Sequence, residues 1–594
     1  MDPYERSQDI YEQIEGYAKP PLIPLPEPND LRTLEYMGLK PSRSAHGIMK
    51  AAMAVSGFNT FQKELPENLE ELLRHSNLRC GGLFAAIHSA SLALEDDARN
   101  LTPIQRAATL LFGASTLHDD IWSASFPPDL YKDQILEMGQ YPNLFSTSLV
   151  VEGPLARIYK SKNVSQITVL IDGRIFILET GGLGKETDIE LLIETLEGLR
   201  EQIVHHPRPG DLPPVGILSC ADHPTTVQIF DALNRSETNR ASFNMLRHSY
   251  LTLCLDLDSF PETHAEAARM AQSENNENRW HHASFQIVVF GNAKACTLFN
   301  FNAYLDGNTM MRSGAEVQKR AASYPLISEN LKSSNNLILV KELPWEIPDE
   351  FIQKARQDIN GVLDTQQATF KFEGIGTETF NKYNVPAVPV FILALQMTAD
   401  EIVGRTTSML QMMTMTRYRC MDLTSASIST PEVTRFVAAM EETDIDRQQA
   451  RQLLTEAVES QIQRARDARQ HLSYDKILGL FIFTRQGFKG ALSRIVMVIS
   501  GVLLRLLKLT TLWDVDIIVS HPAIYPQIPV VGRPGIRLPY VRYFALHYQI
   551  MHDKTVITMM PAVGWEVTNE EFITKLKSNL ERVIGILQSE GDEK

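Results

Sequence analysis

Two β-hairpin patterns constrain the fold of this chain more than any other feature of its sequence. Each joins two runs of β-branched and aromatic residues through a short turn, at Asp172-Gly173 within residues 166–180 and at Gly291-Asn292 within residues 285–301. A turn this short leaves only antiparallel pairing for the strands on its two sides. Helical patterns alternate with the strands and dominate the second half of the chain, for example over residues 431–471. We therefore expect antiparallel strand pairs set among helices.

The last helix is predicted together with its first residue. Thr568 and Glu571 have the spacing of a capping box, in which the side chain of each residue accepts a hydrogen bond from the backbone N–H of the other. Phe572, Leu576 and Leu580 then recur at helical spacing, so this helix should have one apolar face.

The length of the chain, 594 residues, exceeds what one hydrophobic core usually organises. We expect two domains, residues 76–345 and 346–594, and before them an N-terminal arm and helices, residues 1–75, that pack on the second domain. Residues 19–31 are rich in proline, which disfavours helix and sheet pairing, so this part of the arm should be extended. The sequence has no repeat of fixed period and no long low-complexity linker, so the two domains should pack closely.

Charge and apolar segments limit the partners and the location of the chain. The net charge of −15 opposes nucleic-acid binding, because phosphate contacts require a surplus of Lys and Arg on one face. The N-terminus is acidic and lacks the apolar segment of a secretory signal. Residues 495–504 are apolar but too short to span a bilayer, so we expect a buried core helix there and no stable membrane insertion.

The cysteines indicate a reducing compartment. They are odd in number, far apart and without CxxC spacing, which is typical of buried thiols and not of a disulfide framework or a zinc site. The five are Cys80, Cys220, Cys254, Cys296 and Cys420. We therefore expect a cytoplasmic protein, without a metal site.

The segment from Asn302 to Gly307, with the sequence NAYLDG, follows the second hairpin directly. Asn and Asp-Gly are common in turns, so this element alone predicts only a turn. Other segments of the chain make this element more informative. They are Val215 to Leu218, Asn239-Arg240, Leu253 to Asp256, Asn278 to Trp280, Lys354 to Gln357, Phe391 to Gln396, Ser425 to Ser427 and Leu478 to Leu480. In order and spacing these segments resemble the motifs of the choline/carnitine acyltransferase family, over roughly residues 100 to 590.

The resemblance implies an α/β fold of two chloramphenicol-acetyltransferase-like domains, each with a mixed β-sheet flanked by helices, and an active-site tunnel at their interface. It implies a histidine at position 302, which in this family is the general base that takes a proton from the acceptor during acyl transfer. This chain has Asn302 there, and an amide cannot act as that base. The family's structural ion pair behind the histidine is retained as Asp306 and Arg419.

The resemblance also implies an altered acceptor site. The family holds the carboxylate of carnitine with a tyrosine, a threonine and an arginine, and this chain has Thr407, Cys420 and Thr424 at those positions. Loss of the guanidinium removes the charge-assisted contact that recognises a carboxylate. Carnitine is therefore not the expected acceptor.

The donor site that the resemblance implies is half retained. Of two lysines that the family places against the 3′-phosphate of coenzyme A, Lys382 is present and Glu378 replaces the other, so charge repulsion should weaken coenzyme A binding. We expect no required cofactor, and either coenzyme A or a carrier-bound pantetheine thioester as donor. The serine that stabilises the oxyanion in the family is retained as Ser520.

The candidate catalytic residues are therefore Asn302, Ser520 and His521, with Tyr304 as a candidate pocket residue. His521 follows Ser520 and is the candidate substitute base, although a structural role is commoner for a single histidine. One hypothesis is a monomeric enzyme of specialised biosynthesis, repurposed for a small acyl substrate with coenzyme A or an acyl carrier protein as partner. It would transfer an acyl group to an amine or alcohol, or rearrange or cyclise the substrate. The alternative is an inactive relative that binds an acyl ligand or a partner protein.

Overall fold

The computed structural model divides by its internal contacts into unit 1, within residues 1–17, 77–366 and 527–538, and unit 2, within residues 18–76, 367–526 and 539–594. It describes residues 42–56, 73, 79–81, 89–152, 155–161, 164–181, 189–210, 212–325, 338–363, 368–442, 445–470, 495–496, 499–500, 502–503, 506–507, 516–520, 530–531, 544–559, 565 and 567–588.

Unit 1 is built on a mixed sheet that has eight strands within the described residues, in the order β12-β8-β7-β9-β10-β11-β2-β17. Strand β9 is parallel to its two neighbours, β7 and β10, and the other neighbouring strands are antiparallel. The strands are β2 (Ser89–Ala93), β7 (Gln166–Ile171), β8 (Arg174–Glu179), β9 (Thr252–Asp256), β10 (Phe285–Phe290), β11 (Ala295–Asn300), β12 (Leu339–Glu342) and β17 (Val530–Val531).

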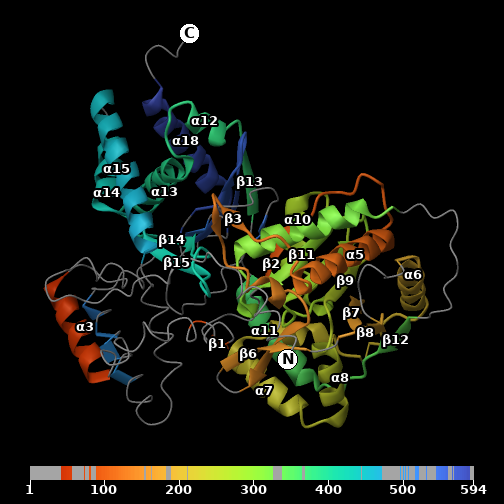
Figure 1. Cartoon of the computed structure of the whole chain (residues 1–594). Helices are drawn as coiled ribbons and strands as arrows, with labels where there is room; N and C mark the ends of the chain where they lie inside the picture. The colour runs from red at the N-terminus through yellow and green to blue at the C-terminus, as the bar shows by residue number, and fades with distance from the viewer. Residues whose placement is uncertain are drawn as a thin grey trace. The chain divides into compact units, whose positions relative to one another are not determined.

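Helices cover both faces of this sheet (Figure 1). On one face, α5 (Pro103–Trp122) packs against β10 and against α10 (Gly307–Ser323), and α6 (Ile189–His205) packs against α5. The other face shares a hydrophobic core with a second set of helices. These are η2 (Val215–Cys220), α7 (His223–Leu233), α8 (Glu237–Arg247), α9 (His264–Ser273) and α11 (Asp349–Leu363).

Smaller elements complete unit 1. Strands β1 (Arg79–Gly81), β6 (Leu155–Lys160) and β5 (Thr147–Glu152) form a three-stranded sheet in that order. Strands β3 (Leu130–Tyr131) and β4 (Gln134–Ile135) pair with each other. The short helices are η1 (Tyr141–Asn143), η3 (Asn276–Asn278) and η4 (Phe301–Ala303).

Both predicted hairpins are confirmed. Strands β7 and β8 pair antiparallel around Asp172 and Gly173, whose φ angles are 52° and 66°. A two-residue hairpin turn requires this left-handed backbone, which Asp tolerates and Gly adopts freely. Strands β10 and β11 pair antiparallel through residues 291–294. The second hairpin ends at Asn300, directly before η4.

Unit 2 is built on a second mixed sheet, which has six strands within the described residues, in the order β13-β19-β18-β16-β14-β15. Strand β16 is parallel to its neighbours β14 and β18, and the remaining neighbours are antiparallel. The strands are β13 (Ala368–Glu373), β14 (Met409–Thr414), β15 (Leu423–Ser427), β16 (Ile517–Ser520), β18 (Phe544–Ile550) and β19 (Lys554–Met559).

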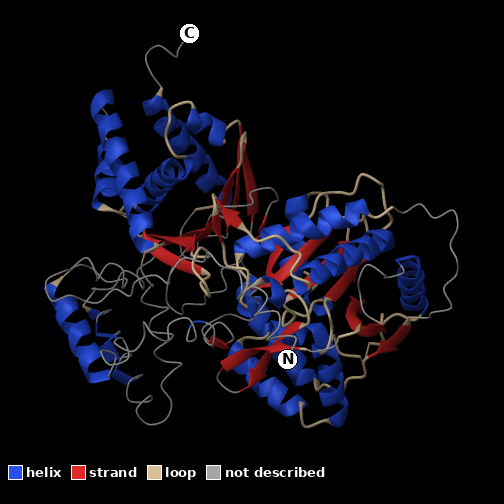
Figure 2. Cartoon of the chain, in the orientation of Figure 1, coloured by secondary structure: helices blue, strands red, loops and turns tan. Residues whose placement is uncertain are grey.

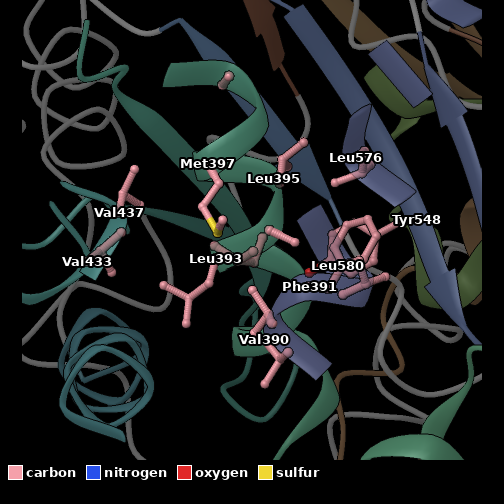
Figure 3. Close-up of a cluster of buried hydrophobic side chains, with 14 of the residues drawn as sticks. Val390, Phe391, Leu393, Leu395, Met397, Val433, Val437, Tyr548, Leu576 and Leu580 are labelled. Atoms are coloured by element: carbon pink, nitrogen blue, oxygen red, sulfur yellow. The ribbon is translucent and has the colours of Figure 1, made fainter. Parts of the chain in front are cut away.

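Four helices share the core of this sheet: α13 (Ala387–Val403), α14 (Pro431–Met440), α15 (Arg447–Ala468) and α18 (Asn569–Leu587). Figure 3 shows side chains of α13 and α18 meeting Tyr548 of β18. The short helix α12 (Thr377–Asn381) precedes α13, and α3 (Arg43–Ser56) lies in the N-terminal part of the unit. Helices and strands alternate along the sequence of both units, and Figure 2 distinguishes the two kinds of element by colour. The predicted α/β class, with two mixed sheets flanked by helices, is confirmed.

The four described cysteine side chains, Cys220, Cys254, Cys296 and Cys420, are buried free thiols, as expected. Burial raises the pKa of the first three to about 12. These three thiols are therefore protonated at neutral pH and poor nucleophiles.

The expectation of a buried core helix over residues 495–504 is wrong for the residues that are described there. Ile495, Ile499 and Val502 are 55%, 61% and 53% exposed, and Leu503 is 42% exposed. These side chains recur at three- and four-residue intervals, so they form an apolar stripe. The sequence shows that residues 495–504 are apolar, but it cannot show whether another element packs against these side chains. None of the described helices combines the length and the apolar composition needed to cross a membrane.

The predicted capping box of α18 is present. The Thr568 hydroxyl oxygen accepts a hydrogen bond from the N–H of Glu571 at 3.2 Å, and the Glu571 carboxylate accepts one from the N–H of Thr568 at 2.9 Å.

Thr568→Ala should lower the free energy of unfolding of unit 2 by about 1 kcal/mol, because the helix loses its N-cap. Thr574→Ala is the matched control: this exposed hydroxyl bonds only the carbonyl of Glu570 within the same helix, and alanine is the better helix former. Urea unfolding followed by circular dichroism measures both. An equal loss in the two variants would contradict the role of the cap.

Candidate functional site

Asn302 lies in η4, the turn that directly follows β11, and is half-buried. Asn300 fixes this turn: its side-chain oxygen accepts from the N–H of Asn302 at 2.9 Å, and its amide donates to the carbonyl of His281 at 2.6 Å. Tyr304 then takes a left-handed backbone, with φ 55° and ψ 59°, and packs on Leu149. The second hairpin therefore places Asn302 directly after the end of β11, an interior strand of the sheet.

Asp306 is the N-cap of α10. Its carboxylate accepts hydrogen bonds from the N–H groups of Asn308 at 3.0 Å and Thr309 at 3.1 Å. Its own N–H donates to the side-chain oxygen of Gln140 at 2.7 Å, which also accepts from the Thr309 hydroxyl at 2.7 Å. Asp306 is 2% exposed. These hydrogen bonds all join residues of unit 1, and the ion pair of Asp306 with Arg419 stays a prediction.

Segments that carry the sequence resemblance meet at a buried ion pair. Arg279 Nη2 lies 2.6 Å from Asp256 Oδ2, and Nη1 lies 3.0 Å from Oδ1. The Asn278 amide donates to the same carboxylate at 2.7 Å. Burial alone would lower the pKa of Arg279, but the charge of Asp256 outweighs it and raises the pKa. A Cβ at Gly216 would clash with the backbone carbonyl of Glu277, so η2 also packs tightly here. These motifs support the fold and do not provide reactive groups.

The paired histidines before β10 have packing roles. His281 is 1% exposed, and its ring nitrogens lie 3.0 Å from the Ser89 hydroxyl and 3.3 Å from the Asn276 side-chain oxygen. Burial lowers the pKa of His282 to about 3, so this imidazole is uncharged at neutral pH.

One row of side chains crosses the sheet of unit 2. Residues that pair directly across neighbouring strands project to the same face of a sheet. Ser520 pairs with Met412 on one side and His547 on the other, and the pairing continues to both edges. The row is Ser425, Met412, Ser520, His547, Thr558 and Thr369. Five of these six side chains are polar, and we call the face that carries them the polar face.

The alternate residues of the same strands project to the opposite face. Val519, Leu546, Tyr548 and Ile557 belong to the hydrophobic core that contains the four helices of unit 2. We call this the helix face. The strands therefore separate an apolar side, which holds the helices, from a polar side, which carries Ser520.

The predicted acceptor residues do not gather on the polar face. Thr424 pairs with Met413, which packs against Ala468 of α15, so Thr424 lies on the helix face and is 4% exposed. The hydroxyl of Thr407 donates to Asp400 Oδ1 at 2.6 Å, and this residue is 1% exposed. Burial raises the pKa of Asp400, although hydrogen bonds from Thr407 oppose the rise. The roles of Thr407 and Thr424 in substrate binding stay predictions.

Cys420 and Arg419 lie in the turn that joins β14 to β15. Cys420 is 9% exposed and has a left-handed backbone, with φ 59°, and Arg419 is half-buried. A hydrogen bond of 2.7 Å from the N–H of Met415 to the carbonyl of Asp422 closes this turn. Their roles in the pocket and in the ion pair also stay predictions.

The predicted donor residues lie together at the surface. Glu378 is in the first turn of α12, and Lys382 follows the end of that helix; both are exposed. His552 adds a ring nitrogen 3.8 Å from the Glu378 carboxylate. A Cβ at Gly376 would clash with the carbonyl of His552, so α12 packs closely against the turn between β18 and β19.

His521 lies outside the described residues, and sequence reasoning missed His547. The alternation of apolar Leu546, Tyr548 and Ile550 with His547 and Gln549 predicts a strand with one polar face. This local alternation cannot predict that the strand lies beside Ser520.

Within the described part of the chain, no group of three or more His, Cys, Asp or Glu side chains is placed to hold a metal ion.

Comparison with known proteins decides the family. The model of the choline/carnitine O-acyltransferase family matches residues 83–491, which is more than half of the chain. The chain belongs to this family. The match includes Asn302 and Asp306 and ends before Ser520, so the oxyanion role of Ser520 stays a prediction.

Two curated relatives in this family are acetyltransferases. The chain is 25% identical over 381 residues to carnitine O-acetyltransferase from Mus musculus, covering 60% of this chain and 58% of that protein. It is 23% identical over 356 residues to choline O-acetyltransferase from Sus scrofa, covering 56% and 55%. The chain thus spans little more than half the length of these relatives.

Among solved structures, a trichothecene 15-O-acetyltransferase from Fusarium sporotrichioides aligns with 96% of this chain and 99% of that chain. The identity is 11% and the TM-score is 0.35. An alignment this loose adds no argument to the family membership.

Proposed function

We propose that this chain is an enzyme of specialised biosynthesis that transfers an acyl group from a thioester to an acceptor other than carnitine. The observation that supports the proposal is the ordered hydrogen bonding around Asn302, a position at which the family resemblance predicts a histidine. We take Asn302 as the replacement of the family histidine. Its N–H donates to the side chain of Asn300, and Asp306 accepts two hydrogen bonds as the N-cap of α10. Such order at a position without its usual base suits a site that has taken a different substrate.

The proposed chemistry is compatible with the loss of the base. An amine or alcohol attacks the thioester carbonyl, the C–S bond breaks, and the proton of the acceptor passes to the leaving thiolate. Ser520 donates a hydrogen bond to the oxyanion that forms in between. An amine is the favoured acceptor, because it is a stronger nucleophile than an alcohol. A rearrangement or cyclisation of a bound acyl metabolite would begin at the same carbonyl.

The proposed donor is a pantetheine thioester on an acyl carrier protein, with coenzyme A as the weaker alternative. Glu378 places a negative charge one helical turn from Lys382, where a coenzyme A phosphate would have to bind. A carrier-bound pantetheine arm has no 3′-phosphate and avoids this repulsion. The buried thiols agree with a reducing compartment, and we propose a cytoplasmic monomer.

The test is a panel of acyl-coenzyme A and carrier-bound thioesters with amine and alcohol acceptors, in which thiol release and acylated product are measured. We expect the wild type to transfer from at least one donor. Asn302→Ala should reduce kcat/KM by about tenfold or more, which is the effect of a lost hydrogen bond at the reacting centre.

Asn244→Ala is the matched control, because Asn244 is exposed on α8, and this variant should behave as wild type. Transfer that occurs only with Asn302→His would refute the proposal. The chain would then be an inactive relative that keeps the acyl-binding fold, and binding of the thioesters without turnover would support that alternative.

A further inference from the structure

His547 lies directly beside Ser520 on the polar face of unit 2. Strands β16 and β18 are parallel neighbours, and their register pairs Ser520 with His547. Neighbouring strands lie about 4.8 Å apart, so one small molecule can contact both side chains. Both residues are half-buried, and the Nε2 atom of His547 is buried.

The hydrophobic core that contains the helices of unit 2 does not include His547. Leu546 and Tyr548, on either side of it in β18, project to the helix face and fill the core. His547 projects away from that core, together with Gln549, which is 1% exposed. The helices of unit 2 pack on the opposite face of the sheet, so their packing does not account for the polar side chains on this face.

A serine and a histidine in adjacent register positions provide two groups that acyl transfer needs. The hydroxyl can donate a hydrogen bond to the oxyanion, and the imidazole can accept the proton of the attacking group. Histidine suits this second task because it titrates near neutral pH.

We propose that His547 is the general base of the acyl transfer proposed for this chain. The inference rests on the proposed acyl transfer. The acceptor N–H or O–H forms a bond from its nitrogen or oxygen to the thioester carbonyl carbon and gives its proton to His547. The C–S bond then breaks, and the leaving thiolate takes that proton, so that free thiol and acylated acceptor are the products.

The first experiment compares the kinetics of wild type and His547→Gln, which keeps a polar side chain of similar length. We expect kcat to fall by about a hundred- to ten-thousandfold, the usual effect of removing a general base. The rise of kcat/KM with pH that deprotonation of a general base causes should also disappear, a change that a structural role would not cause. His205→Gln, at an exposed position on α6, is the matched control and should keep both.

The second experiment does not depend on turnover. The chloroacetyl thioester of pantetheine carries an electrophilic carbon beside the carbonyl; an imidazole nitrogen displaces chloride, forms an N–C bond and loses its proton. Mass spectrometry should find this adduct on His547 in wild type and in His205→Gln. The labelling of wild type decides the question even if His547→Gln does not fold.

The outcomes separate this inference from the proposed function. Transfer by wild type that His547→Gln retains with an unchanged pH profile would overturn the inference and leave the proposed function standing. Adducts elsewhere, or none, would also overturn it. Labelling of His547 without transfer from any donor would support the thioester site at His547 and refute acyl transfer.

Discussion

Arg279→Met should lower the free energy of unfolding of unit 1 by about 3–5 kcal/mol, because it leaves a buried carboxylate without its partner. The side chains of Arg279 and Asp256 are 0% and 1% exposed, so water cannot replace the lost contacts. Asn278 would remain as a hydrogen-bond donor to Asp256, but an amide does not neutralise the charge.

The matched control is Arg200→Met, which removes an ion pair with Glu197 on the surface of α6. There the two side chains are 44% and 30% exposed, and the loss should not exceed about 1 kcal/mol. Urea unfolding followed by circular dichroism measures both variants. The double variant Arg279→Met with Asp256→Leu should recover part of the stability, since it removes both buried charges. Equal effects of Arg279→Met and Arg200→Met would contradict this account.

Local patterns predicted the elements of this fold whose causes are local. The hairpin at Asp172-Gly173 and the capping box at Thr568 depend on residues within a few positions of one another, and both are present. The pairing of Asp256 with Arg279 joins residues from two separate segments. Sequence reasoning noted both segments as part of a resemblance, but it could not predict their contact.

In the candidate site, too, features with local causes were predicted and features that depend on strand pairing were not. Asn302 was placed correctly at the end of a hairpin, because the strand before it has a clear pattern. The face of Thr424 depends on which residue of β14 it pairs with, and a shift of one residue would reverse it. The importance of His547 depends on the order of strands in the sheet, which places β18 next to β16. Neither register nor strand order is encoded in a short segment, so both required the structure.

Gly113→Ala and Gly198→Ala should change the stability of unit 1 in opposite directions, although both replace a helical glycine by alanine. Gly113 is buried in α5, where a Cβ would clash with the carbonyl of Val317 and lie 3.0 Å from the backbone nitrogen of Ala321 in α10. Both atoms belong to the backbone and cannot rotate away. The two helices must therefore separate, which we expect to be unfavourable by about 1–3 kcal/mol.

Gly198 is exposed in α6, and nothing lies within 4 Å of the position of its Cβ. Gly198→Ala should therefore stabilise unit 1 by about 0.5–1 kcal/mol, because alanine has a higher helix propensity than glycine. Thermal unfolding should give a lower Tm for Gly113→Ala and a higher Tm for Gly198→Ala than for wild type. A higher Tm in both variants would show that α5 and α10 can move apart at little expense, and that the close approach of the two helices does not require glycine.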